Sequence, residues 1–224
     1  MAGSGLVVLY GGTFDPVHNG HLAIARAAAR ALGCVVRLMP AADPPHRPAP
    51  GASARQRAHM LDLAVQDEPE LRVDLRELER QGPSYTVQTL RELRAADPQV
   101  PVALLVGADS FIGLPSWRDW QALFGLTHFV IADRPGEAWG PGSLPGPLAA
   151  QAQGRWSDDP AELSAQPAGR LLALRQPLHE ASATDLRARI AAGRPWRHLV
   201  PAAVAGYIQA HGLYRDAADT ASSL

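Results

Sequence analysis

Lysine is absent from this chain of 224 residues, and all 21 basic residues are arginine. The absence excludes a phosphate-binding loop that depends on lysine, a Schiff base on a lysine amine and a lysine general base. A bound phosphate must therefore be held by arginine, histidine or backbone N–H groups. The formal net charge of −1 provides no general field for a polyanion, so nucleic acid is not an expected partner.

Cysteine occurs once, at Cys34, which excludes an internal disulfide and a cysteine-rich metal site. Its apolar neighbours predict a buried strand residue rather than a nucleophile. No apolar run approaches the roughly 20 residues of a membrane-spanning helix. The segment Met1–Gly5 lacks the positive charge of a secretory signal. We therefore expect a cytoplasmic protein that has no membrane partner.

Short apolar runs alternate with longer amphipathic segments along the chain, a pattern that predicts an α/β fold with a mostly parallel sheet. The runs expected to form strands are 6–9, 35–39, 71–75, 102–106, 127–132 and 171–174. Among the expected helices, one starts at Ser53 and carries a basic face with Arg55 and Arg57. The segment 137–169 is rich in Gly and Pro and shows no periodicity, so we expect an insertion or mobile flap. We predict one domain over residues 1–215, followed by a disordered tail at 216–224.

The first expected strand is joined to the first expected helix by the stretch Tyr10–His21, with the sequence YGGTFDPVHNGH. Its paired glycines allow the backbone to approach a bulky anion, and Asn19 is placed to cap the helix, whose first N–H groups would face the same space. His18 and His21 are three residues apart, so a helix that begins at Asn19 brings both rings to one spot. Imidazoles there can donate hydrogen bonds to phosphoryl oxygens. The stretch therefore predicts a phosphate site.

This stretch resembles the H-x-G-H motif of the nucleotidyltransferase superfamily, and its longer form resembles the nicotinate-nucleotide adenylyltransferase branch. The resemblance continues in the same order from Leu6 to Tyr214. It includes PPHR at 44–47, GPSYT at 82–86, GAD at 107–109, Trp117, RPG at 134–136, SATDLR at 182–187 and the last helix. Arg47 stands where the family usually has lysine, and Arg118 where an aromatic residue is common. Ala181 and Ala183 replace an isoleucine and a serine.

The resemblance implies a Rossmann-like, doubly wound α/β domain with helices on both faces. It also implies transfer of AMP from ATP to nicotinate mononucleotide in NAD biosynthesis, with Mg²⁺ mainly on the ATP phosphates and no protein metal site. The implied catalytic residues are His18, His21 and Arg187. The implied ATP-binding residues are Gly11, Gly12, Thr13, Phe14, Gly20, Asp109, Ser182 and Thr184. The implied mononucleotide-binding residues are His46, Arg47, Ser84, Tyr85, Thr86, Trp117 and Arg134.

Alternatives to this function remain open. A relative with the same fold could use nicotinamide mononucleotide or pantetheine phosphate as acceptor, although the pantetheine-phosphate enzyme usually has Thr where His18 stands and relies on lysines. A non-catalytic nucleotide-binding module would keep the glycines without needing two histidines and Arg187 aimed at one phosphate. Either Ser182 or Thr184 could cap its helix. Core packing is the rival role for Trp117, the expected role for Trp120, and a structural role is expected for His211.

Overall fold

The computed structural model of the chain describes residues 5–42, 51–80, 82, 84–132, 141–176 and 181–215. Within these residues seven strands form one sheet, and every pair of neighbouring strands is parallel. The strands are β1 (Val7–Gly12), β2 (Val36–Pro40), β3 (Leu71–Val73), β4 (Val102–Gly107), β5 (His128–Ala132), β6 (Trp156–Ser157) and β7 (Leu171–Leu174). All but β6 coincide with apolar runs that were expected to form strands, so the predicted parallel α/β sheet is confirmed.

Helices alternate with these strands, as the sequence pattern predicts. The α-helices are α1 (Asn19–Leu32), α2 (Ala54–Val65), α3 (Arg76–Glu79), α4 (Thr86–Ala96), α5 (Ala108–Ile112), α6 (Trp120–Leu126), α7 (Gly146–Ala152), α8 (Glu162–Ala165), α9 (Ala183–Ala191) and α10 (Ala202–Ala210). The 3₁₀ turns are η1 (Leu114–Ser116), η2 (Pro141–Ser143) and η3 (Arg197–Leu199).

Local sequence signals set the ends of several helices. Before α2, the Ser53 hydroxyl accepts the Gln56 N–H at 3.3 Å, and the Gln56 side chain accepts the Ser53 N–H at 2.9 Å. This reciprocal pair satisfies two backbone donors that the helix itself leaves unpaired. Gly33 follows α1 with φ of 61°, a left-handed conformation that glycine adopts without a Cβ clash. The Ser182 hydroxyl caps α9 by accepting the Asp185 N–H at 3.2 Å, so Ser182 rather than Thr184 is the cap.

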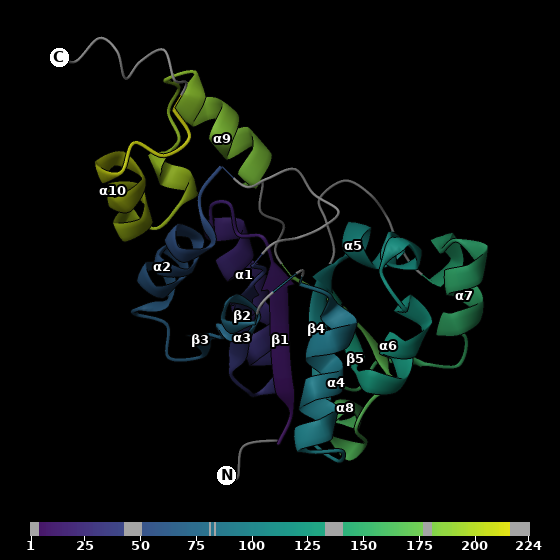
Figure 1. Cartoon of the computed structure of the whole chain (residues 1–224). Coiled ribbons are helices and arrows are strands. Elements are labelled where there is room, and N and C mark those ends of the chain that lie inside the picture. Colours follow the sequence, from purple (N-terminus) through teal and green to yellow (C-terminus); the bar gives the residue numbers. More distant parts are fainter. Residues whose placement is uncertain are drawn as a thin grey trace, which may run out of the picture.

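The strand order β3-β2-β1-β4-β5-β7-β6 reverses direction between β1 and β4. In a doubly wound sheet, ligands bind outside the carboxyl ends of the strands at this reversal. At these ends, β1 leads into the stretch Tyr10–His21 and β4 leads into α5, which carries Asp109. In Figure 1 this edge of the sheet is remote from the end marked N. The topology therefore places the predicted phosphate loop at the expected ligand edge.

Two apolar cores lie on the two faces of the sheet. One core joins the strands to α1, α2, α9 and α10 and includes Leu22, Leu61 and Val204, each at most 1% exposed. The other joins them to α4, α5, α6 and α7 and includes Leu90 and Phe111. Figure 1 shows α4 and α6 beside β4 and β5, and α2 next to α10 at the other side of the sheet. Burial on both faces explains why the central strands are apolar throughout rather than alternating.

The segment 137–169 differs from the expected flap over its described part, residues 141–169. It forms η2, α7, β6 and α8, and it buries Leu148 and Leu163 completely. Strand β6 pairs with β7 and extends the sheet. Short helices rich in Gly and Pro carry little periodicity and depend on tertiary packing, so the sequence pattern did not reveal them. Residues 137–140 and the tail 216–224 lie outside the described residues, and the single-domain boundaries stay a prediction.

Three residues with expected structural roles behave differently from one another. Cys34 lies in the turn before β2 and is half-buried, so the expected strand position is wrong, although burial raises the pKa of its thiol to about 11. Trp120 packs edge-on against Phe124 with ring centroids 6.3 Å apart, as expected. The His211 Nδ1 hydrogen-bonds the Tyr207 carbonyl at 3.0 Å. Among the described residues, no helix combines the length and apolar character needed to cross a membrane.

Candidate active site

The two motif histidines cap the helix on which they lie. Helix α1 begins at Asn19, as predicted, but its N-cap is His18 and not Asn19. The His18 Nδ1 accepts the His21 N–H at 3.4 Å, and the His21 Nδ1 accepts the His18 N–H at 3.3 Å. The His18 imidazole thus caps the helix in place of the Asn19 side chain, which instead donates to the His198 carbonyl at 3.0 Å. The two rings stack, with centroids 3.7 Å apart and planes inclined by 26°.

This reciprocal cap determines which ring nitrogens can donate. Because Nδ1 accepts a hydrogen bond in both rings, each neutral imidazole carries its proton on Nε2. His18 is 6% exposed, so its orientation is also fixed by packing. The Phe14 ring meets the His21 ring edge-on at 5.0 Å, and Tyr10 meets Phe14 at 5.5 Å. The cap and the aromatic contacts therefore fix the orientation of both rings, with Nε2 as the donor nitrogen of each.

Two glycines of the stretch leave little room for a side chain. A Cβ on Gly12 would lie 3.1 Å from the Phe14 ring, whose residue has a left-handed φ of 49°. A Cβ on Gly20 would lie 3.0 Å from the His18 ring and 3.2 Å from the Ala181 carbonyl. The paired glycines Gly11 and Gly12 were expected to let an anion approach the backbone, and Gly20 was implied only as an ATP-binding residue. In the structure, Gly12 and Gly20 make room for neighbouring side chains and for the segment that precedes α9.

Arg187 lies beside this stretch, although it is far away in sequence. Its Nη1 donates to the Asp15 carbonyl at 2.7 Å and lies 3.9 Å from the Asp15 carboxylate. The Arg187 side chain is 36% exposed, so it is also accessible to a ligand. The fold therefore brings the motif SATDLR, at 182–187, next to the stretch Tyr10–His21, as a shared phosphate site would require.

Arg57 is a residue whose position the sequence did not indicate. It was expected on a basic face of α2, but it is completely buried, and burial lowers its pKa. Its guanidinium donates to the carbonyls of Thr13, Ala41, Ala42 and Ala52, at distances of 2.6, 2.7, 3.1 and 3.3 Å. These carbonyls flank the segment 43–50 and the phosphate loop. Arg57 thus binds described residues on both sides of the segment 43–50, the segment that includes His46 and Arg47.

A small cavity of about 40 Å³ brings together four of the predicted mononucleotide-binding residues and one residue, Arg118, that was not predicted to bind. It is lined by Ser84, Tyr85, Thr86, Trp117 and Arg118. Helix α4 begins here, and its N-cap residue, Tyr85, makes no side-chain capping hydrogen bond. The cavity therefore combines backbone N–H donors, aromatic surface and a cation.

Ser84 and Arg118 have roles in this cavity that the sequence did not show. The Ser84 hydroxyl does not cap α4 but accepts the Ala42 N–H at 3.1 Å, so it joins the cavity to the end of the loop before residue 43. The Arg118 guanidinium carbon lies 4.8 Å from the centre of the Tyr85 ring, a cation–π contact. The departure from the family pattern at position 118 was the available signal, since it replaces an aromatic surface by a charge.

Of the other predicted site residues, some lie in described elements and others lie outside the described residues. Asp109 is exposed in the first turn of α5, at the carboxyl end of β4. Gly11 lies in β1 beside Met39, and Thr184 lies in the first turn of α9. His46, Arg47 and Arg134 lie outside the described residues. No group of three or more His, Cys, Asp or Glu side chains suited to a metal occurs within the described part of the chain.

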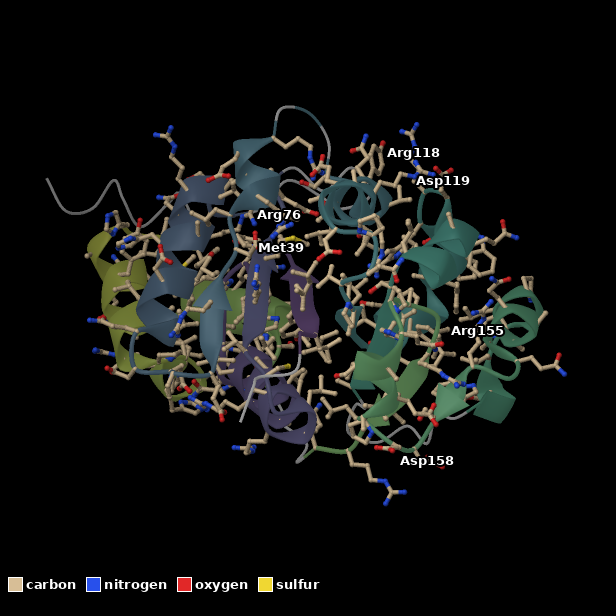
Figure 2. All side chains as sticks on the ribbon, turned by 90° about the horizontal axis from the view of Figure 1, so that it is seen from below. Met39, Arg76, Arg118, Asp119, Arg155 and Asp158 are labelled. Carbon is tan, nitrogen blue, oxygen red and sulfur yellow. The ribbon has the colours of Figure 1, made fainter. Side chains whose placement is uncertain are left out.

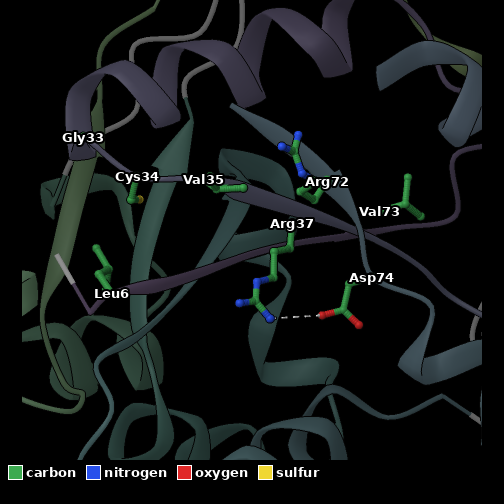
Figure 3. A pocket seen from close by; sticks show the side chains of 8 residues that line it. All are labelled: Leu6, Gly33, Cys34, Val35, Arg37, Arg72, Val73 and Asp74. Carbon is green, nitrogen blue, oxygen red and sulfur yellow. Dashed lines mark ion pairs between the residues drawn. The ribbon is translucent and has the colours of Figure 1, made fainter. Parts of the chain in front are cut away.

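A larger cavity, of about 560 Å³, lies away from these groups (Figure 3). Leu6 and the turn Gly33–Val35 line it at the amino ends of β1 and β2, together with Arg37 and residues 72–74. The Arg37 guanidinium lies 4.0 Å from Asp74, and Asp74 also pairs with Arg76 at 2.7 Å. Its size does not make it the active site, because the oriented donors gather at the opposite, carboxyl edge of the sheet.

The fold and the candidate site together define a class: a doubly wound α/β domain whose histidine and arginine donors gather at the reversal of its strand order. Comparisons with known proteins agree. A family model described as cytidylyltransferase-like matches residues 9–189. A probable nicotinate-nucleotide adenylyltransferase of Stenotrophomonas maltophilia is 58% identical over 216 residues, covering 94% of this chain and 97% of that protein. One from Marinobacter nauticus is 46% identical over 209 residues, covering 92% and 95%.

A solved structure supports the same fold. The nicotinic acid mononucleotide adenylyltransferase of Plasmodium falciparum, complexed with NaAD, has a TM-score of 0.72 and 14% identity, covering 93% of this chain and 97% of that one. At this identity the likeness concerns the fold alone. On the sequence matches, the chain belongs to the cytidylyltransferase-like nucleotidyltransferases and, within them, to the nicotinate-nucleotide adenylyltransferase family.

Proposed function

We propose that this protein transfers AMP from ATP to nicotinate mononucleotide, giving nicotinate adenine dinucleotide and pyrophosphate in NAD biosynthesis. The observation that carries the proposal is the meeting of three groups at the carboxyl edge of β1 and β4: the stacked pair His18 and His21, and Arg187. These groups suit a triphosphate, and the cavity at the start of α4 suits a pyridine ring that bears an acid.

The reaction needs no protein nucleophile. A phosphate oxygen of the mononucleotide attacks the α-phosphorus of ATP, a new P–O bond forms, and the bond from the α-phosphorus to the β-phosphate oxygen breaks in line. Pyrophosphate leaves with the electron pair of that bond. Catalysis then consists of positioning and charge stabilisation. His18, His21 and Arg187 supply donors to the α- to γ-phosphates, where negative charge shifts during the reaction.

Mg²⁺ enters this proposal as part of the ATP substrate. The described residues offer no cluster of carboxylates or imidazoles that would hold the ion by themselves. Exposed Asp109, at the end of β4, is placed to bind ribose hydroxyls or a water of the ion. Gly11, Gly12, Thr13, Phe14, Gly20, Ser182 and Thr184 complete the proposed ATP site.

The acceptor occupies the other side of the proposed site. The N–H groups in the first turn of α4 receive the pyridine carboxylate, the Trp117 ring stacks on the base, and Ser84, Tyr85 and Thr86 line the pocket. His46, Arg47 and Arg134 are proposed to bind the mononucleotide phosphate and sugar. Arg57 supports this binding indirectly, because it fixes residues 41, 42 and 52 on both sides of the loop.

Pyrophosphate release tests the proposal. Purified protein is given Mg²⁺ and ATP with no acceptor, nicotinate mononucleotide, nicotinamide mononucleotide or pantetheine phosphate. We expect release only with the pyridine mononucleotides, and faster release with the acid. Preferred use of pantetheine phosphate would assign a different acceptor to the same fold, and binding of ATP without release under any condition would indicate a non-catalytic module.

A further inference from the structure

The C-terminal part of the chain reaches the phosphate loop through Tyr214. This residue follows α10, and its backbone has a left-handed φ of 65°, which is unfavourable for an aromatic residue. Its hydroxyl donates to the Asp15 Oδ1 at 2.7 Å, across 199 positions of sequence. Burial and the negative charge of Asp15 raise the pKa of the Tyr214 hydroxyl, so it stays a donor. The strained backbone is held where this bond forms.

Asp15 is a buried carboxylate with several donors. It is 5% exposed, and besides Tyr214 it accepts the Gly51 N–H at 2.8 Å and the Ala52 N–H at 3.1 Å. Arg187 contacts the same residue, but through the Asp15 carbonyl at 2.7 Å rather than through a close pair with the carboxylate, which is 3.9 Å away. Asp15 therefore links the stretch Tyr10–His21, the residues Gly51 and Ala52 before α2, the C-terminal segment and Arg187.

The Tyr214 ring also packs against the loop end. A Cβ built on Gly51 would lie 2.9 Å from the ring, so an alanine there would displace the ring or the loop. The hydroxyl and the ring of Tyr214 thus fit the positions of Asp15 and Gly51 at the same time. This fit makes two separate substitutions available, one that removes the hydroxyl and one that moves the ring.

We propose that Tyr214 is a positioning residue that acts through Asp15 on Arg187. Its hydroxyl donates one of the hydrogen bonds that stabilise the buried Asp15 carboxylate. Because the carboxylate is stabilised in this way, Arg187 does not form a close ion pair with it. Arg57, another cation near Asp15, is already bound to four carbonyls. Arg187 thereby stays available to the ATP phosphates. The inference rests on the proposed function, since it requires that Arg187 act on the phosphates.

The test is a double-mutant cycle between Tyr214→Phe and Arg187→Lys. We expect Tyr214→Phe to lower kcat about tenfold, as the loss of one hydrogen bond to a charged group would, and to leave the KM for nicotinate mononucleotide unchanged. In the Arg187→Lys background the same change should lower kcat by less than twofold, because the residue on which it acts has been altered. Tyr207→Phe is the matched control: it removes a hydroxyl from the same C-terminal region, where the ring packs on His211, and should leave kcat unchanged.

Gly51→Ala provides a second route to the same answer if Tyr214→Phe does not fold. It moves the Tyr214 ring while keeping the hydroxyl, and it should show the same lack of additivity with Arg187→Lys. Independent, multiplicative losses in both cycles would overturn the inference. That result differs from failure of the proposed function, in which the wild-type protein would release no pyrophosphate or Arg187→Lys would retain full activity.

Discussion

The phosphate side and the pyridine side of the site are built in different ways. On the phosphate side, which comprises Tyr10–His21 and Arg187, side chains from distant segments are tied together by the reciprocal histidine cap and by Asp15. On the proposed pyridine side, which comprises Ser84–Thr86, Trp117 and Arg118, the cavity has about 40 Å³, and the Tyr85 side chain does not cap the helix start. Arg118 and its neighbour Asp119 lie at the surface of the molecule (Figure 2).

The proposed function gives the two sides different tasks. Charge moves during phosphoryl transfer, so donors that are already oriented lower the barrier without reorganising. The pyridine ring does not react, so the pocket needs only to bind and select it. Substitutions on the phosphate side should therefore act mainly on kcat, and substitutions on the pyridine side mainly on KM and on the choice between acceptors.

The largest expected effect comes from the histidine stack. His18→Ala and His21→Ala should each lower kcat by about 10² or more with a modest change in KM, a loss of roughly 3 kcal/mol of transition-state stabilisation. Each change removes an Nε2 donor and half of the reciprocal cap. Steady-state kinetics measured with thermal unfolding separates the two losses. His211→Ala, which removes an exposed imidazole outside the site, is the control. A folded His18 or His21 variant with near-normal turnover would remove that residue from the catalytic set.

Selection of the acid over the amide is the next largest effect. Helix-start N–H groups only donate, so a carboxylate satisfies them with two oxygens, whereas an amide turns its own NH₂ donor toward one of them. We expect kcat/KM for nicotinate mononucleotide to exceed that for nicotinamide mononucleotide by about 10², equivalent to about 3 kcal/mol. Trp117→Ala should weaken both substrates alike, because a ring stacks on either base. A wild-type ratio near one would indicate a dual-specificity enzyme.

Arg47 tests whether the acceptor phosphate is bound separately from the ATP phosphates. Arg47→Ala should raise the KM for the mononucleotide about tenfold, as expected when one charged hydrogen-bond donor is lost, and leave the KM for ATP little changed. Arg47→Lys, which restores the residue usual in the family, should recover most of the affinity. Equal changes in both KM values would place Arg47 outside the acceptor site.

Much of the fold and the core of the site could be predicted from the sequence because their signals are local. Continuous apolar runs reported the central strands, and the glycine and histidine spacing reported the start of α1 at Asn19. Ser182 was one of two possible caps, and the structure selects it. The resemblance placed Arg187 near the histidines, a long-range relation that no periodicity within this sequence reveals.

The features that were missed depend on tertiary contacts. The sequence around Arg57 is typical of a solvent-exposed face of a helix. Its burial depends on four carbonyls, which belong to Thr13, to residues 41 and 42, and to Ala52 just before α2. Likewise, nothing near Tyr214 in the sequence indicates a bond to Asp15. Asn19 rather than His18 was expected to cap α1, because imidazole is an uncommon cap, and nothing in the sequence indicated that the Ser84 hydroxyl accepts the Ala42 N–H.

The smallest expected effect concerns Arg118, and it sharpens the comparison most directly. Arg118 lines the pyridine cavity from the surface, with its guanidinium against the Tyr85 ring. An exposed cation at roughly 6 Å from a carboxylate contributes about 0.7 kcal/mol in water, or about threefold. Arg118→Gln should therefore reduce the acid-to-amide ratio of kcat/KM about threefold through the KM for the acid, while kcat stays the same.

Salt dependence and a matched variant identify the origin of this threefold change in the acid-to-amide ratio of kcat/KM. Because the Debye length falls from about 10 Å at 0.1 M to about 3 Å at 1 M, wild type and Arg118→Gln should converge at high ionic strength. Arg91→Gln makes the same charge change on the nearby surface, where Arg91 pairs with Asp119 at 3.1 Å outside the cavity lining, and should leave the ratio unchanged. If Arg118→Gln instead changes the KM for the acid and the KM for the amide by the same factor at all salt concentrations, the side chain acts by packing on Tyr85. Selection of the acid would then come from the backbone of α4 without help from the neighbouring charge.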